Sequence, residues 1–344
     1  MGASRYVGNI RDVLDERKAA ILQAVVQEYI RTAQPVGSNH VLAATGVDVS
    51  AATVRNEMAA LEADGFLQQP HTSAGRVPTD KGYRFFVDSI ARPGPLDSVR
   101  AQQVRTFFAH AHGALEQMLS DTSQLLTRLT DHVAVVVGAP FEQATVRSVQ
   151  LVGLSSRVVL AVTVLSNGSI ERQTIELGAE LADDQITAAS VHLARFMVGH
   201  PASGQAIVAP TGDPAVDALV EAAHAALTST GRAPEPIYVG GVARMAEAFD
   251  AVETVRSVLR TLEEQYVVVS LVRDILDRGL SVAIGSELGL EQLSSCSVVV
   301  APFEIDGEPA GSIGVVGPTR MNYEQALASV AIVSRRLGQR LSEG

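Results

Sequence analysis

The strongest constraint in this sequence is a run of three short helix-forming segments separated by tight turns. Asp15 is placed to cap the first segment, Ser38 the second and Ser50 the third, since Asp and Ser side chains accept hydrogen bonds from the free amides of a first helical turn. Gly65 follows the third segment and favours a left-handed helix end. Short helices in this arrangement predict a helix-turn-helix core.

An extended hairpin is expected directly after the third helix. Residues 66–69 and 76–78 are extended in character and enclose a turn rich in small and polar residues. A β-hairpin in this position is typical of the wing of a winged-helix domain. Thr79 is placed to cap a fourth helix, and a Pro/Gly cluster at 91–95 marks a boundary. We therefore assign residues 1–92 to a winged-helix domain.

A long amphipathic helix and an antiparallel meander are expected next. Apolar residues keep a helical rhythm from Asp97 to Thr130, which predicts one helix that connects the first domain to the rest. Four strand-like runs follow between residues 133 and 177, and Asn167-Gly168 supplies a hairpin turn between the last two. We predict that these four runs form a single antiparallel meander.

A mainly helical stretch then interrupts the sheet pattern. Helices are expected near 183–198, 213–229 and 252–278. Strands then resume at 297–303 and 310–316, and a helix at 323–341 closes the chain. This order predicts an α+β multidomain protein whose antiparallel sheet is split in sequence by an inserted, mainly helical domain. The expected boundaries are 97–180 for the first part of the split domain, 181–260 for the insertion and 261–344 for the second part.

The formal net charge of −11 argues against nucleic-acid binding until it is divided along the chain. Residues 1–92 carry ten Lys+Arg and ten Asp+Glu, whereas residues 93–344 carry seventeen and twenty-eight. The acidic excess therefore lies entirely downstream of the first domain. A domain of balanced charge is still a weak electrostatic signal, so charge alone does not predict DNA binding.

Membrane, metal and catalytic functions find little support in the sequence. Apolar stretches fall short of the roughly 18 residues of a membrane span, which favours the cytoplasm and no membrane partner. Cys296 is a single cysteine, and the eight histidines lack the spacing of metal ligands. Carboxylate pairs such as Asp183-Asp184 are explained as helix caps. We therefore expect no cofactor, no metal and no enzymatic activity.

The outward face of the third helix carries side chains that suit base recognition. Val54 and Met58 take the packing positions, which leaves Arg55 and Asn56 outside. Arg can donate two hydrogen bonds to guanine and Asn can pair with adenine, while Ser50 and the first-turn amides can hold a phosphate. For an isolated helix, an ordinary solvated face is the better interpretation.

A longer string of residues shifts this balance. From Ser50 to Asp88 the chain contains SAATVRNEM, GFL, PHTSAGRVPT and KGYRFFVD, and this string closely resembles the signature of the HrcA family. LDER at 14–17, PVGS at 35–38 and GVVGPTRMNY at 314–323 also resemble that family. Residues 180–260 match loosely, through IYVGG at 237–241. The resemblance therefore reaches both ends of the chain.

The resemblance implies a fold and a function. It implies a winged-helix domain, a GAF-like domain split in sequence, and an inserted domain used for dimerisation. It also implies repression of heat-shock chaperone operons by a homodimer that binds an inverted-repeat operator in double-stranded DNA and is kept active by the GroE chaperonin. The alternative is a winged-helix regulator whose GAF-like domain senses a small molecule, although aliphatic strands such as 157–162 supply few polar groups for a ligand.

The expected DNA contacts lie on the third helix, the wing and the start of the fourth helix. Arg55 and Asn56 are expected to read bases, whereas Arg76 and Lys81 are expected to hold phosphates. The full predicted DNA-binding set is Ser50, Thr53, Arg55, Asn56, His71, Ser73, Arg76, Lys81 and Arg84.

Overall fold

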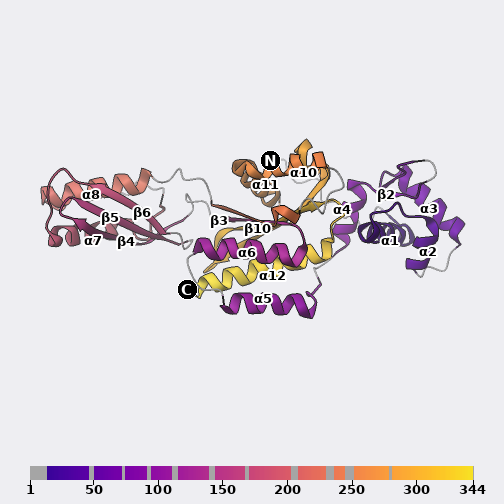
Figure 1. Ribbon diagram of the computed structural model, residues 1–344, viewed down its shortest axis with the longest axis horizontal. Helices are drawn as coiled ribbons and strands as arrows, with labels where there is room; N and C mark the ends of the chain where they lie inside the picture. Colours follow the sequence, from indigo (N-terminus) through magenta and orange to yellow (C-terminus); the bar gives the residue numbers. More distant parts are fainter. Residues whose placement is uncertain are drawn as a thin grey trace.

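The computed structural model arranges the chain as three bodies along one long axis (Figure 1). We call them the N-terminal body (residues 14–90), the central body (residues 94–138 and 236–343), which holds the larger sheet, and the distal body (residues 144–229). The structure describes residues 14–45, 50–71, 74–90, 94–110, 115–138, 144–166, 170–202, 208–229, 236–244, 252–278 and 281–343.

The N-terminal body follows the predicted order of helices and hairpin. The first and third helices begin at their predicted caps, because Asp15 accepts a hydrogen bond from Lys18 N at 2.8 Å and Ser50 accepts one from Thr53 N at 3.1 Å. The second helix begins at Ser38 itself, so the cap predicted at Ser38 is wrong by one residue, and Gly37 O accepts from Val41 N at 3.3 Å. Gly65 ends the third helix with a φ of 78°, in the left-handed region. The elements are α1 (Glu16–Thr32), α2 (Ser38–Thr45), α3 (Ala51–Ala63), the antiparallel pair β1 (Leu67–Gln68) and β2 (Val77–Pro78), and α4 (Asp80–Ser89).

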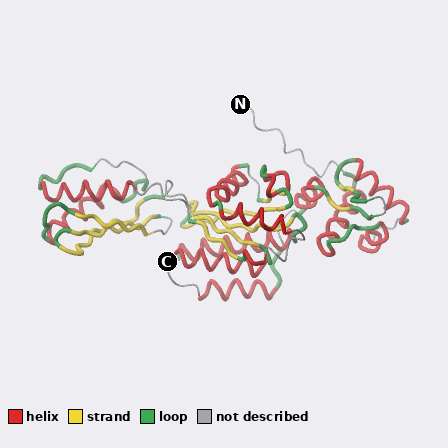
Figure 2. The backbone as a smooth tube through the Cα atoms, turned by 45° about the horizontal axis from the view of Figure 1, so that its top comes forward, coloured by secondary structure: helices red, strands yellow, loops and turns green. Residues whose placement is uncertain are grey.

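The central body is an antiparallel five-stranded sheet between two layers of helices (Figure 2). Alternate residues along its strands point to opposite faces, so each face has its own apolar cluster. One face packs on α6 (Leu115–Thr130) and α12 (Tyr323–Ser342), and the other packs on α10 (Val252–Glu263) and α11 (Gln265–Asp277). The strand order is β7 (Ile237–Gly240), β3 (Val133–Gly138), β10 (Glu308–Pro318), β9 (Cys296–Ile305) and β8 (Val282–Ile284).

The distal body has a separate core. Its antiparallel sheet contains β4 (Val146–Ser155), β5 (Val158–Leu165) and β6 (Ile170–Glu176), and the helices α7 (Asp183–Met197) and α8 (Pro214–Ser229) cover one face of that sheet. Alternate β5 residues are buried under these helices, whereas the side chains between them are half-buried on the open face. Among the residues described, none of the helices combines the length and apolar character that crossing a bilayer requires.

The single long helix expected from Asp97 to Thr130 is wrong. The structure has α5 (Ser98–His110) and α6 in its place, and residues 111–114 lie outside the described part. Arg100 Nε donates to Leu129 O at 3.1 Å, so the start of α5 lies beside the end of α6. One straight helix would separate these residues by about 44 Å. The helical rhythm alone did not reveal the reversal, because both helices bury apolar residues against the same core.

The four-stranded meander expected between residues 133 and 177 is also wrong. β3 pairs with β7 and β10 in the central sheet, whereas β4, β5 and β6 form the distal sheet. The expected boundary at residue 180 therefore falls within the distal body, which holds three strands as well as helices. β7 and α10, expected to lie in the insertion, belong to the central body. The hairpin turn expected at Asn167-Gly168 lies outside the described residues.

Candidate nucleic-acid interface

The third helix presents four of the predicted DNA-binding residues on one exposed end. Val54 and Met58 are 0% and 1% exposed, so they hold α3 against the rest of the N-terminal body. The side chains of Arg55 and Asn56 are exposed to solvent, and among the described residues neither side chain has a hydrogen-bond or ion-pair partner. At the helix start the Ser50 and Thr53 hydroxyls lie 2.9 Å apart. A solvent-facing guanidinium and amide beside an exposed helix N-terminus suit a DNA groove and its phosphates.

The acidic side chains beside this face are neutralised by neighbouring cations. Each of three acids on or after α3 forms an ion pair within the N-terminal body, which reduces the repulsion that a DNA phosphate would meet there. The pairs are Arg17 with Glu57 at 2.6 Å, Lys18 with Asp64 at 3.7 Å, and Arg76 with Glu62 at 2.9 Å.

The remaining predicted contacts lie away from the exposed end of α3. Arg76 is bound to Glu62 with its side chain 15% exposed. Lys81 donates to Asp64 O at 2.8 Å and stacks on the Phe66 ring, 4.1 Å from its centroid. His71 is exposed next to the hairpin turn, and Ser73 lies outside the described residues.

Arg84 occupies a different surface from the other predicted contacts. Its Nε donates to Glu287 Oε1 at 2.8 Å, and its Nη2 donates to Val282 O at 2.8 Å, both in the central body. Burial opposes the charge, yet the hydrogen bond and the charge of Glu287 raise the pKa of Arg84 above its ordinary value. Arg84 therefore joins two bodies, and we do not include it in the DNA surface.

A latch between the N-terminal and central bodies was not predicted. We use that name for Asp80 and Arg84 of α4 with Ser286 and Glu287. The Asp80 carboxylate accepts hydrogen bonds from Ser286 N at 2.9 Å and Ser286 Oγ at 2.8 Å. Gly285 has a φ of 52°, and a Cβ there would collide with the Asp80 carboxylate. Because the partners are about 200 residues apart, no local sequence pattern indicated the contact.

Aromatic packing continues the core across the same junction. The rings of Tyr83 in α4 and Tyr323 in α12 lie 5.9 Å apart, and both side chains are buried. One apolar cluster contains residues of the N-terminal body together with α6, α12 and the central sheet. The position of α3 is therefore tied to the central body through packed side chains.

The side of the sheet under α10 and α11 leaves little room for a ligand. The cavity there is about 10 Å³, lined by aliphatic residues such as Val135, Val272 and Leu293. That volume is at the lower limit for one water molecule. The small-molecule alternative therefore gains no support from this space.

The described residues offer no constellation for metal chemistry or thiol catalysis. No group of three His, Cys, Asp or Glu side chains among them is placed to hold a metal ion. Cys296 is buried, and burial raises the pKa of its thiol to about 12. A thiol with such a pKa is almost wholly protonated at neutral pH and is a poor nucleophile.

The burial of His132 is expected to make the stability of the fold depend on pH. Its Nδ1 is buried without a hydrogen-bond partner among the described residues, and burial lowers its pKa to about 4. Since the unfolded side chain has a pKa of about 6.5, protons favour the unfolded state. The contribution of His132 to the free energy of unfolding is therefore fully present above about pH 6.5 and is lost as the pH falls toward 4. The expected loss at pH 5 is about 2 kcal/mol.

Unfolding by urea at pH 7 and pH 5 measures this loss. His132→Asn is expected to remove about 2 kcal/mol of the pH-dependent change, whereas His71→Asn, at an exposed position, should leave it intact. An equal pH dependence in wild type and His132→Asn would show that the imidazole does not titrate in this way.

Comparison with known proteins identifies the family. The model of the HrcA protein C-terminal domain matches residues 116–327. The chain belongs to the HrcA family. Two curated relatives named heat-inducible transcription repressor HrcA come from Nocardioides sp. and Nocardia farcinica. The first is 38% identical and the match covers 96% of this chain and 99% of the relative, and the second is 36% identical with 98% and 100% covered.

The HrcA family is a family of transcription repressors and not of enzymes, as predicted. A solved structure described as a hypothetical protein at 2.2 Å resolution shares the fold. It aligns with a TM-score of 0.66 at 22% identity, over 96% of this chain and 99% of that chain.

Proposed function

We propose that this HrcA-family chain acts in the cytoplasm as a repressor of heat-shock chaperone operons and binds an inverted-repeat operator in double-stranded DNA as a homodimer. The observation that carries the proposal is the near full-length match to heat-inducible transcription repressors. We further infer that the N-terminal body is a winged helix and that the central body is a GAF-like domain. The hairpin after α3 and the split antiparallel sheet support these assignments.

In this proposal α3 enters the major groove. Arg55 and Asn56 contact base edges, while Ser50, Thr53 and the first-turn amides hold a phosphate. The hairpin side of the N-terminal body lies along the DNA backbone, where Arg76 and Lys81 are the predicted phosphate contacts and His71 and Ser73 are the other predicted DNA contacts.

Substitution of the two base readers tests the DNA-binding function. Arg55→Ala or Asn56→Ala is expected to cost about 1 to 3 kcal/mol in operator binding and to relax the preference at one base pair. Fluorescence anisotropy with the operator and with single-base variants measures both effects. Arg157→Ala, an exposed arginine of the distal body, is the matched control. If Arg55→Ala discriminated between bases as wild type does, α3 would not be the recognition helix.

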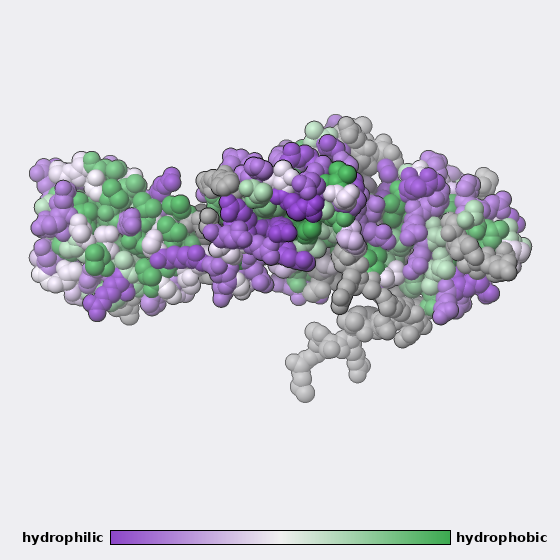
Figure 3. All heavy atoms as spheres, turned by 90° about the horizontal axis from the view of Figure 1, so that it is seen from below, coloured by the Kyte–Doolittle hydropathy of each residue, from purple (hydrophilic) through white to green (hydrophobic). Residues whose placement is uncertain are grey.

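The open face of the distal sheet supports the homodimer. Val152 is 44% exposed and pairs with Leu160, while Ile170 is 46% exposed and pairs with Val164. Val162 lies on the same face of β5 and pairs with Gln150 and Arg172. Figure 3 shows apolar surface gathered on this body. An apolar patch across three strands is typical of an interface. A second copy of the same face supplies a self-complementary cover with two-fold symmetry, which matches an inverted repeat.

We also infer that the GroE chaperonin keeps the repressor folded and active. Under heat stress other unfolded proteins occupy the chaperonin, so less of it is available to the repressor. The segments Val133–Val137 and Val298–Val300 are aliphatic and buried in the central sheet. Opening of that sheet exposes β-prone, uncharged strands that favour aggregation over refolding. The active fraction then depends on a chaperone that shields the open state.

Refolding experiments test the chaperonin dependence. Dilution from denaturant should yield several-fold more operator-binding protein with GroE and ATP than without them, because shielding limits aggregation. The gain should shrink when an unfolded competitor protein is added. Complete spontaneous recovery of operator binding after a heat pulse, at micromolar protein without chaperonin, would contradict this regulation.

A further inference from the structure

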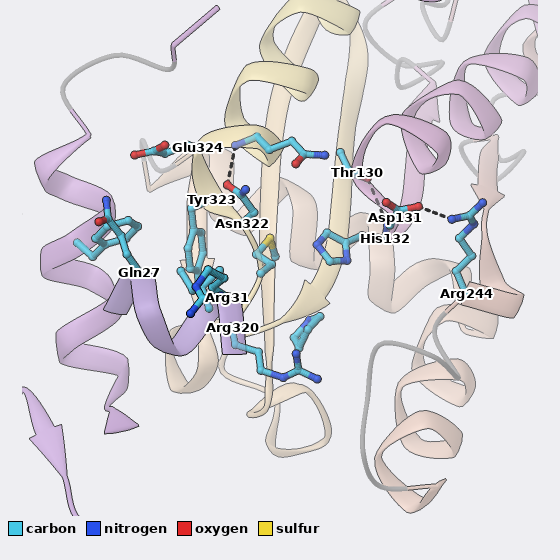
Figure 4. A pocket seen from close by; sticks show the side chains of 15 residues that line it. Gln27, Arg31, Thr130, Asp131, His132, Arg244, Arg320, Asn322, Tyr323 and Glu324 are labelled. Carbon is cyan, nitrogen blue, oxygen red and sulfur yellow. Dashed lines mark hydrogen bonds and ion pairs between the residues drawn. The ribbon is translucent and has the colours of Figure 1, made fainter. Parts of the chain in front are cut away.

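A cleft of about 650 Å³ lies where the N-terminal body meets the central body. The N-terminal body supplies one wall from α1 and α4, and the central body supplies the other (Figure 4). Its size is within the range of about 300 to 1,000 Å³ typical of small-molecule sites. The lining residues used here are Arg31, Phe86, Asp131, Arg244, Arg320 and Glu324.

Positive charge predominates in the cleft. Three arginines line it against two acids, Asp131 and Glu324. Asp131 forms an ion pair with Arg244, and Figure 4 places the Glu324 carboxylate on the far side of the cleft from Arg320. His132, which also lines the cleft, is neutral at pH 7 because burial lowers its pKa to about 4.

A further feature favours an anion at this position. The twenty-residue helix α12 begins in the cleft, where Asn322 caps it through a hydrogen bond from Gln325 N at 3.1 Å, so the positive end of its dipole faces the space.

Arg31 is available to an anion although it has a partner. It binds Glu28 through two hydrogen bonds of 3.1 and 2.7 Å, but its side chain is 71% exposed. Exposed ion pairs contribute little free energy, so a phosphate group can replace or share this contact at small cost. The apolar part of the lining, including Ile30, Phe86 and Met321, can pack against an uncharged portion of the same ligand.

We propose that this cleft binds a phosphorylated small molecule of nucleotide size, with its phosphates between Arg31 of the N-terminal body and Arg320 of the central body. Such a ligand contacts both the N-terminal and the central body, so it stabilises their docked arrangement relative to any other. By linkage, the ligand then changes operator affinity. The regulatory part of this proposal rests on the proposed function, whereas the binding site itself does not.

Calorimetric titration of the full chain with ADP, pyrophosphate and adenosine tests the site at constant ionic strength. We expect ADP to bind with a dissociation constant below 1 mM, pyrophosphate to bind more weakly and adenosine not to bind detectably. Arg31→Gln and Arg320→Gln should each weaken ADP binding at least about tenfold, the loss of one charge-assisted contact. Arg335→Gln, at an exposed position near the other end of α12, is the matched control.

The outcomes separate the site from the DNA function. Failure of wild type to bind ADP or pyrophosphate, or equal binding by wild type and Arg31→Gln, overturns the proposal. Arg31 is exposed, so that variant is expected to fold, and its melting curve checks this. Operator binding is measured separately without nucleotide. A chain that binds operator but not ADP refutes the site alone, and one that binds ADP but not operator refutes the proposed function alone.

Discussion

Leu160→Asp combined with Val164→Asp is expected to convert the homodimer into monomers. Both side chains lie on the open face of the distal sheet, where Leu160 pairs with Val152 of β4 and Val164 pairs with Ile170 of β6. Dimerisation would then bury two uncompensated carboxylates in each copy, and each costs several kcal/mol. We expect the dimer dissociation constant to rise at least about a thousandfold, or roughly 4 kcal/mol.

Sedimentation velocity and native mass spectrometry measure this change, and operator binding should fall with it because two linked N-terminal bodies bind two half-sites together. Val191→Asp is the matched control. Val191 lies on α7 and is 67% exposed, away from the open sheet face. A double variant that remained a dimer, with unchanged circular dichroism, would place the interface elsewhere on the molecule.

The N-terminal body could be predicted from its sequence because its signals are local. Asp15 and Ser50 cap helices within three residues of themselves, and Gly65 takes the left-handed conformation that ends α3. The packing face of α3 followed from the helical spacing of Val54 and Met58, which are buried. Each of these features depends on contacts within one or two turns of chain.

The arrangement of the strands could not be predicted in the same way. β3 and β5 are both aliphatic runs, and their residues do not specify whether β3 pairs with β4 or with β10. The choice depends on partners far along the chain, since Val137 lies opposite Ser312 in the register of β3 and β10. Where Gly311 meets β3, a Cβ would collide with Val137 O, so close backbone approach helps to define this pairing.

The role of Arg84 could not be predicted from the sequence either, because its partners also lie far along the chain. An arginine in a helix after a wing is a reasonable candidate for a phosphate contact, and the family string places it among the DNA-binding residues. In the structure its partners are Glu287 and Val282, about 200 residues away, and they come together only when the two bodies pack. Sequence spacing carries no information about such a contact.

Removal of the Arg84 side chain is expected to lower stability more than removal of any exposed arginine. Arg84→Met leaves Glu287 without its cation at a site where the two side chains are 17% and 28% exposed. Loss of one partner of a buried pair costs up to about 3 to 5 kcal/mol, and partial exposure here reduces the expected loss to about 3 kcal/mol. Urea unfolding measures the loss, and hydrogen exchange of α4 amides reports whether the junction has loosened.

Arg157→Met is the control, because its partner Glu180 lies 3.4 Å away on the surface with both side chains more than 60% exposed. Such a pair contributes at most about 0.5 kcal/mol. Arg84→Met combined with Glu287→Leu should recover part of the loss, since the double variant leaves no buried charge. If Arg84→Met unfolded at the same urea concentration as Arg157→Met, with no faster exchange in α4, the latch would not hold the two bodies together.

A loosened latch should also weaken operator binding, because two N-terminal bodies that pivot freely lose the fixed spacing that an inverted repeat requires.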